Sequence, residues 1–167
     1  MTDRYMTIYL RDHRALGEAC LDLCHRIRRA NRDNSIGPAM SELEADLQED
    51  LDLQDRVMDL LKIAPSTWKK LGYRAAQRLG HLKLNGEFFR YSPLSRLLEL
   101  EGLLAWVDTR RELWMTLEDA RRVYPVLEQV PISRMVAQSG RHHQTLRELH
   151  QEAARHMIKR GQHPGAR

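Results

Sequence analysis

The most constraining feature of the sequence is a leucine-rich stretch, residues 82–117, that carries charges inside an apolar run. From Leu94 onward its apolar side chains cover well over half of a helical wheel, so a helix formed here must be contacted from several sides. Arg96, Glu99 and Arg110 border this broad apolar face. Because an unpaired buried charge is costly, we expect these three side chains to pair with charges on neighbouring helices. The stretch predicts the central helix of an all-helical domain.

Three further long helices are predicted from apolar residues that recur at spacings of three and four. The first covers residues 3–32, and the last runs from residue 132 to 159. The second begins at Ser41, where Glu44, three residues later, completes a capping-box pattern. Asn, Asp, Ser, Gly and Pro at residues 31–38 indicate a loop between the first two helices.

The central helix begins in a favoured order, with Ser92 as its N-cap and Pro93 in its first turn. A short additional helix is expected at residues 67–84. The predicted fold class is therefore all-α: an up-and-down four-helix bundle, ferritin-like in architecture, with a short extra helix. We expect residues 1–160 to form this single domain and residues 161–167 to be a disordered tail.

The composition argues against several classes of protein. No apolar run approaches the roughly 18 residues that a membrane-spanning helix needs, and the N-terminal stretch carries charges where a signal peptide is apolar. A cytoplasmic protein is therefore expected. The two cysteines, Cys20 and Cys24, have a spacing that rarely permits disulfide geometry. We expect them to be small buried side chains without thiol chemistry.

Charge is distributed unevenly along the chain. Residues 40–61 contain eight acids and one base, whereas residues 62–96 contain eight bases and one acid. A basic segment is one feature of nucleic-acid-binding proteins, and this function is kept as an alternative. We favour the simpler interpretation that the two oppositely charged segments pack side by side.

Two aspartates and a histidine raise a second alternative, a metal-dependent enzyme. Asp46 and Asp50 are four residues apart on the second helix, and His13 lies on the apolar face of the first. Carboxylates and imidazole are common metal ligands. However, di-iron bundles use Glu-x-x-His motifs on two helices, and the sequence contains no such motif, nor a Walker, GxGxxG, GxSxG or HExxH motif. No metal or other cofactor is therefore predicted.

A set of short motifs runs through residues 5–118: in chain order, Asp12-His13, Asp46 and Asp50, Lys83 with Asn85-Gly86, Ser92 to Arg96, Glu99 to Glu101, and Leu113-Trp114. In this pattern the chain resembles a family of small, uncharacterised bacterial helical-bundle proteins, mostly actinobacterial. The resemblance implies a ferritin-like or four-helix bundle and supplies no activity. Two positions depart from the family pattern, because Trp106 stands where members tend to have Gly and Arg110 where they tend to have Lys.

We therefore predict a non-enzymatic helical-bundle protein that oligomerises, as a homodimer, or binds a small ligand. Its site is an inward polar cluster, either structural or a ligand pocket, formed by His13, Asp46, Asp50, Arg96, Glu99 and Arg110. The alternatives are a metal-dependent ferritin-like enzyme that uses His13, Asp46 and Asp50, and a nucleic-acid-binding protein that uses residues 62–96. The sequence assigns no catalytic residue and no particular ligand.

Overall fold

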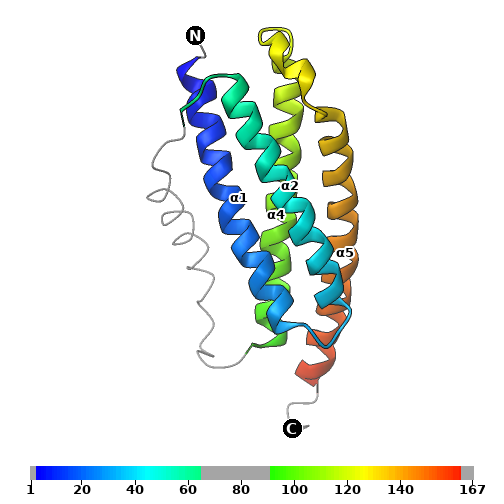
Figure 1. Ribbon diagram of the computed structural model, residues 1–167. Helices are drawn as coiled ribbons and strands as arrows, with labels where there is room; N and C mark the ends of the chain where they lie inside the picture. Colours follow the sequence, from blue (N-terminus) through cyan, green and yellow to red (C-terminus); the bar gives the residue numbers. More distant parts are fainter. Residues whose placement is uncertain (1–2, 65–90, 163–167) are drawn as a thin grey trace.

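A computed structural model of the protein describes residues 3–64 and 91–162. The described chain forms four long α-helices and a short 3-10 helix: α1 (Arg4–Ala30), α2 (Ile36–Leu60), α4 (Pro93–Ala120), η2 (Pro125–Gln129) and α5 (Ile132–Gln162). These helices pack into one bundle (Figure 1), which confirms the predicted all-α four-helix fold. None of the described helices is long and apolar enough to cross a bilayer. The short helix predicted at 67–84 and the tail residues 163–167 lie outside the described residues, and residues 161–162 belong to α5.

The four helices form two antiparallel hairpins, α1 with α2 and α4 with α5, that lie side by side (Figure 1). Helices α2 and α4 run in the same direction, since Ile36 and Leu97 share one apolar cluster whereas Met58 and Leu117 share another. A strictly alternating up-and-down order would make α2 and α4 antiparallel. Accordingly, Ile63, at the end of the first hairpin, packs in the cluster of Met58 and Leu117, whereas Leu97, near the start of α4, packs in the other cluster.

Helix α2 begins at Ile36, so the start predicted at Ser41 was wrong. The side chain of Asn34 accepts a hydrogen bond from the Ile36 N–H at 2.9 Å. Pro38 fits here because the first turn of a helix needs no N–H donor. At the start of α4 the prediction is confirmed, because the Ser92 hydroxyl accepts a hydrogen bond from the Ser95 N–H at 3.1 Å.

The core consists of two apolar clusters at different heights in the bundle. One joins the end of α1, the start of α2, the first half of α4 and the second half of α5. The other joins the opposite ends of the same helices to η2. Helical spacing in the sequence predicts an inner face of α2 that carries Met40, Leu43, Leu47, Leu51, Gln54, Met58 and Leu61. All seven are buried, which confirms this face.

Buried polar side chains lie between the two clusters. On each of the four helices they fall between the residues of one cluster and the residues of the other. We call this set the polar layer: Arg14, Asp50, Gln54, Arg110, Gln138 and Ser139.

Two glycines permit close packing within the first hairpin. A Cβ atom at Gly17 would lie 2.5 Å from the Leu51 side chain, and one at Gly37 would lie 2.6 Å from the carbonyl oxygen of Asn31. The Asn31 oxygen belongs to the backbone, so it cannot move aside as a side chain can. The turn between α1 and α2 therefore requires glycine at residue 37.

Substitution of Gly37 by alanine should destabilise the protein, because the turn must shift to admit the methyl group. We expect Gly37→Ala to lower the free energy of unfolding by about 1–3 kcal/mol. Gly140, in the middle of α5, is exposed, and a Cβ there would meet nothing within 4 Å. Gly140→Ala should therefore raise the free energy of unfolding by about 0.5–1 kcal/mol. Urea denaturation measures both changes, and a loss of stability in both variants would contradict this account of the turn.

Candidate functional site

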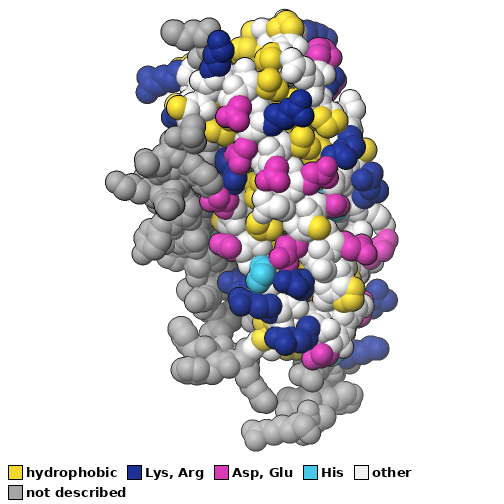
Figure 2. Space-filling view, viewed as in Figure 1, with side chains coloured by type: hydrophobic (Ala, Val, Ile, Leu, Met, Phe, Trp, Pro, Cys, Tyr) yellow, Lys and Arg dark blue, Asp and Glu magenta, His cyan; other side chains and the backbone are white. Residues whose placement is uncertain are grey.

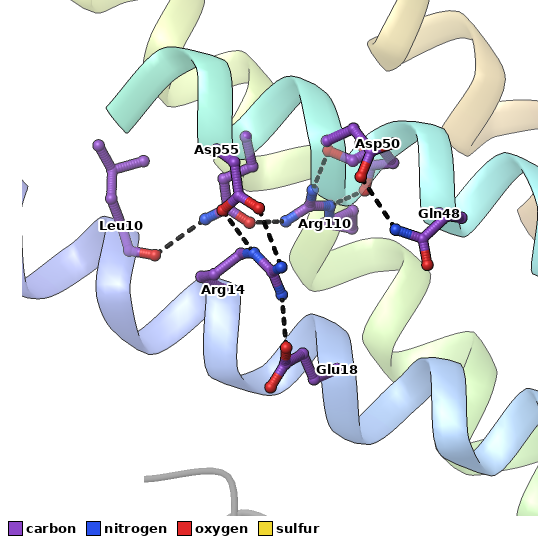
Figure 3. A network of polar contacts seen from close by, with 9 residues as sticks. Leu10, Arg14, Glu18, Gln48, Asp50, Asp55 and Arg110 are labelled. Carbon is purple, nitrogen blue, oxygen red and sulfur yellow. Dashed lines mark hydrogen bonds and ion pairs between the residues drawn. The ribbon is translucent and has the colours of Figure 1, made fainter. Parts of the chain in front are cut away.

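The centre of the polar layer is an ion pair between Asp50 on α2 and Arg110 on α4 (Figure 3). The Asp50 side chain is 7% exposed and the Arg110 side chain 3% exposed. The Nε of Arg110 donates to one carboxylate oxygen of Asp50, and its Nη2 donates to the Asp50 backbone carbonyl at 3.0 Å. One guanidinium group thus contacts both the side chain and the backbone of α2.

Gln54 and Trp114 complete this network. Arg110 Nη1 donates to the side-chain oxygen of Gln54 at 2.7 Å, and the Gln54 amide donates to the Leu10 carbonyl on α1 at 2.9 Å. Trp114 Nε1 donates to the second Asp50 carboxylate oxygen at 2.6 Å. Each polar group of the central pair therefore has a hydrogen-bond partner, and the network joins α1, α2 and α4.

The charge of Asp50 is stabilised chiefly by Arg110 and Trp114. Burial raises the pKa of the Asp50 carboxyl, and the adjacent Arg110 charge and Trp114 hydrogen bond act in the opposite direction. Desolvation is the larger effect, as expected where water is almost excluded. Removing either partner would leave the other charge buried and unpaired.

His13 lies beside the pair but makes no ion pair with it. Its ring packs against that of Tyr9, with 4.4 Å between the ring centroids. Burial, together with the nearby positive charge of Arg110, lowers the pKa of His13 to about 4. At neutral pH the His13 imidazole is therefore uncharged.

Asp46 points toward α5 instead of toward Asp50. One of its carboxylate oxygens lies 2.8 Å from His142 Nε2. Although partial burial acts to raise the pKa of Asp46, hydrogen bonds from His142 and Gln138 lower it below its usual value. Asp46 thus joins α2 to α5 at the edge of the polar layer.

Arg96 and Glu99 lie near the start of α4 (Pro93–Ala120), away from Arg110. Glu99 pairs with Arg26 on α1 at 2.9 Å, and the Arg96 guanidinium lies over the Tyr91 ring, 5.7 Å from its centroid. Burial raises the pKa of Glu99, which Arg26 and a hydrogen bond from Tyr91 partly offset. Tyr91 also accepts a hydrogen bond from the fully buried Asn31 at 2.8 Å.

The six predicted site residues thus fall into three groups. Asp50 and Arg110 form the central pair with His13 beside them, Asp46 joins His142, and Arg96 and Glu99 lie close to Tyr91. The expected single cluster is not formed, because helical spacing assigns a residue to a face and leaves its height and neighbour open. Among residues 3–64 and 91–162, no group of three or more His, Cys, Asp or Glu side chains is arranged to hold a metal ion.

The acids of α2 have partners on three other helices. Glu44 pairs with Arg28 and Asp55 with Arg14, both on α1; Asp46 and Glu49 meet α5, and Asp50 meets α4. Acidic side chains run along the face of α2 that is in view in Figure 2. We expected these acids to face the basic segment 62–96, whose residues 65–90 lie outside the described chain. That expectation therefore stays a prediction. Among the described residues, acids of α2 pair with α1, α4 and α5.

The two cysteines are buried and free, as predicted. Burial raises the pKa of both thiols, that of Cys24 to about 12. Because the thiolate is the reactive form of cysteine, neither side chain is poised for chemistry at neutral pH.

A small pocket adjoins the polar layer between α2, α4 and α5. Its polar lining comes from Asp50, Arg110, Gln138, Ser139 and His142. The pocket has space for about one water molecule. It is far smaller than the roughly 300 Å³ at which small-molecule sites begin.

Sequence reasoning missed Gln54, Trp114, Asn31 and His142 as members of these networks. Gln54 was assigned to the inner face of α2, and its polar group among leucines was the available signal. Trp114 is assigned to the apolar face by its spacing, and the sequence does not indicate that its single N–H donates a hydrogen bond. His142 was one of several histidines on the last helix, and spacing alone does not select it.

Comparisons with known protein families, with curated proteins and with solved structures found no significant match. The resemblance described above therefore rests on its motifs alone. What the site can do follows from its own geometry.

Loss of one partner of the central pair should be strongly destabilising, because the other charge stays buried. We expect Asp50→Ala to lower the free energy of unfolding by about 3–5 kcal/mol. The neighbouring Glu49 pairs with Arg134, but both side chains are about half exposed. Glu49→Ala should therefore cost less than about 1 kcal/mol. The double replacement Asp50→Leu with Arg110→Met should recover most of the loss; equal losses in the two single variants would contradict this account.

His13 should make stability fall on acidification. Its folded-state pKa of about 4 lies below the ordinary histidine value of 6.5, so the unfolded chain takes up a proton first as the pH falls. The contribution is full above about pH 6.5 and is lost between there and about pH 4. Allowing for partial exposure, we expect His13 to account for about 1–2 kcal/mol of lost stability between about pH 7.5 and about pH 5.

Urea denaturation of wild type and His13→Gln at both pH values measures this effect. The variant carries the other histidines unchanged, so the difference between the two proteins isolates His13. Identical pH dependence in the two proteins would show that His13 is not held neutral by the fold.

Proposed function

We propose that this protein is a non-enzymatic helical-bundle module that acts through its outer surface, and that its polar layer is structural. One observation carries the proposal: the Asp50–Arg110 pair is enclosed by hydrogen bonds to its own chain, beside a pocket with space for about one water molecule. A substrate or drug-sized ligand would have no room there. The polar groups of Asp50 and Arg110, which suggested an active site, bond to neighbouring helices instead.

Two finer predictions concern architecture and location. The parallel course of α2 and α4 supports a ferritin-like arrangement, because ferritin-like bundles differ from strictly alternating ones in this respect. A cytoplasmic location stays a prediction from the sequence. The competing function, a metal-dependent enzyme that uses His13, Asp46 and Asp50, is not favoured, because Asp50 is paired with Arg110 and Asp46 with His142.

The outer surface offers an exposed apolar set at one end of the bundle. Tyr5 is 79% exposed, Ile8 44% and Val123 71%. The start of α1 lies beside the turn that holds Val123, because the Asp3 N–H donates to the Tyr124 hydroxyl at 3.4 Å. We call Tyr5, Ile8 and Val123 the apolar end; a contiguous apolar patch on a surface commonly marks an interaction site.

A second copy of the chain is the partner that we propose for the apolar end. Charges of both signs surround it, since Arg4 and Asp12 are exposed one turn to either side of Ile8 on α1. In a twofold dimer the same surface patch meets itself, so a patch with both signs supplies its own complementary charges. The proposal thus needs no further protein.

The test is the oligomeric state of the wild-type protein and of a double variant, Tyr5→Ser with Ile8→Ser. We expect the wild type to sediment as a dimer at micromolar concentration and the double variant to sediment as a monomer, because apolar contact area is removed. Ile158 is also exposed, 55%, but lies near the end of α5, so Ile158→Ser serves as the control and should stay dimeric.

Two outcomes would contradict the proposal. A monomeric wild type would remove the homodimer. Elemental analysis that found a stoichiometric transition metal in the purified protein would contradict the non-enzymatic reading and restore the metal-dependent alternative.

A further inference from the structure

Exposed basic residues gather at the end of the bundle that holds the turn between α1 and α2. Arg29 lies in the last turn of α1 and Arg32 in the turn that follows, and both residues are exposed. On α5, Arg155 and Lys159 are exposed as well. Figure 2 shows Lys and Arg side chains gathered toward the lower end of the molecule, where α1 ends. We call Arg29, Arg32, Arg155 and Lys159 the basic end.

A hydrogen bond joins the two elements that carry the basic end. The Ser35 hydroxyl, in the α1–α2 turn, donates to the Glu152 carboxylate of α5 at 3.3 Å. Arg155 and Lys159 follow Glu152 by three and seven residues, so they continue the face of α5 that meets the turn. Figure 1 shows the α1–α2 turn beside the last turns of α5. The four bases therefore belong to one surface.

The charges of the basic end are not used inside the protein. Among residues 3–64 and 91–162, no carboxylate lies within ion-pair distance of any of the four bases. Asp33 and Glu152 lie at the same end, but Glu152 already accepts the hydrogen bond from the turn. Near the end of α4, by contrast, Arg121 pairs with both Glu118 and Glu128.

The chemistry of the basic end suits phosphate groups. Three of its four bases are arginines, and a guanidinium group matches the oxygens of a phosphate with two parallel hydrogen bonds. A nucleic acid carries closely spaced phosphates along its backbone, so several of the four bases can be engaged at once.

A duplex fits this surface better than a single strand does. Proteins that hold single strands stack the bases on open aromatic rings. Tyr91 is 37% exposed and lies near this end, since it bonds Asn31, but the Arg96 guanidinium lies over its ring, 5.7 Å from the centroid. A duplex presents its phosphates on the outside and requires no stacking.

We propose that the basic end binds the phosphate backbone of double-stranded nucleic acid, without regard to base sequence. Arg29, Arg32, Arg155 and Lys159 each contact phosphate, and phosphate contacts carry no direct sequence information. This function goes beyond the homodimer and does not depend on it, because the basic end and the apolar end lie at opposite ends of α1. It also uses other residues than the basic segment 62–96.

An anionic lipid surface suits the basic end less well. A helix that lies in a membrane interface buries an apolar face. On the described part of α5, Ile158 is the one large apolar side chain that is exposed. Lipid vesicles therefore serve as the contrasting probe in the test.

The salt dependence of binding tests the proposal. Fluorescence anisotropy of labelled DNA and RNA duplexes of about 20 base pairs, titrated with the full chain between about 50 and 200 mM salt, gives the observed association constant. Four phosphate contacts predict that its logarithm falls against log salt with a slope of about −3 to −4. The triple variant Arg29→Gln, Arg32→Gln, Arg155→Gln should reduce the slope to about −1 and weaken binding at least about tenfold at about 50 mM salt.

A variant with the same change in net charge is the matched control. Arg56, Arg111 and Arg122 are exposed arginines on other parts of the surface, and their replacement by Gln should leave both slope and affinity near the wild-type values. Binding to neither duplex at about 50 mM salt, or an equal loss in the two triple variants, would overturn the proposal. Wild-type protein that sediments with vesicles of phosphatidylglycerol and binds neither duplex would show that the surface recognises lipid instead.

Discussion

The rest of the structure depends on the burial of one charged pair, Asp50 with Arg110, between two apolar clusters. Such a pair adds little net stability over apolar residues, since desolvation offsets its attraction. Its effect lies in the geometry that it demands. Arg110 satisfies its donors only when Asp50 and Gln54 of α2 are at the correct height. Gln54 in turn donates to the Leu10 carbonyl of α1. The pair therefore specifies the relative height at which the two hairpins pack.

The other acids of α2 also join this helix to its neighbours. Its carboxylates contact α1, α4 and α5, and most of these contacts are partly exposed. Exposed pairs contribute little energy each, but together they mark α2 as the helix against which the others are aligned. An acidic helix among arginine-rich neighbours is thus an organising element of the described bundle. Its expected contact with the basic segment 62–96 stays a prediction.

Much of the fold followed from the sequence, and much of the site did not. The inner face of α2 was predicted correctly from apolar spacing, and so was the serine cap of α4, because both are local properties. The start of α2 was misplaced because Asn34, whose side chain bonds the Ile36 N–H, and the tolerated Pro38 resemble loop residues. Glu99 and Arg110 pair with charges on neighbouring helices, as expected, whereas Arg96 lies over the Tyr91 ring. Their partners could not be assigned, because neighbours across a bundle depend on the relative direction and height of helices.

The hairpin arrangement has a consequence for how the molecule assembles. Contacts within each hairpin are close in sequence and form quickly, whereas contacts between hairpins require closing a much longer loop. Docking is then the step at which register is decided. A displacement by one helical turn, about 5.4 Å, would leave Asp50 and Arg110 desolvated without each other. The buried charges thus select the correct register, because a misaligned docking of the hairpins is destabilised by two unpaired buried charges.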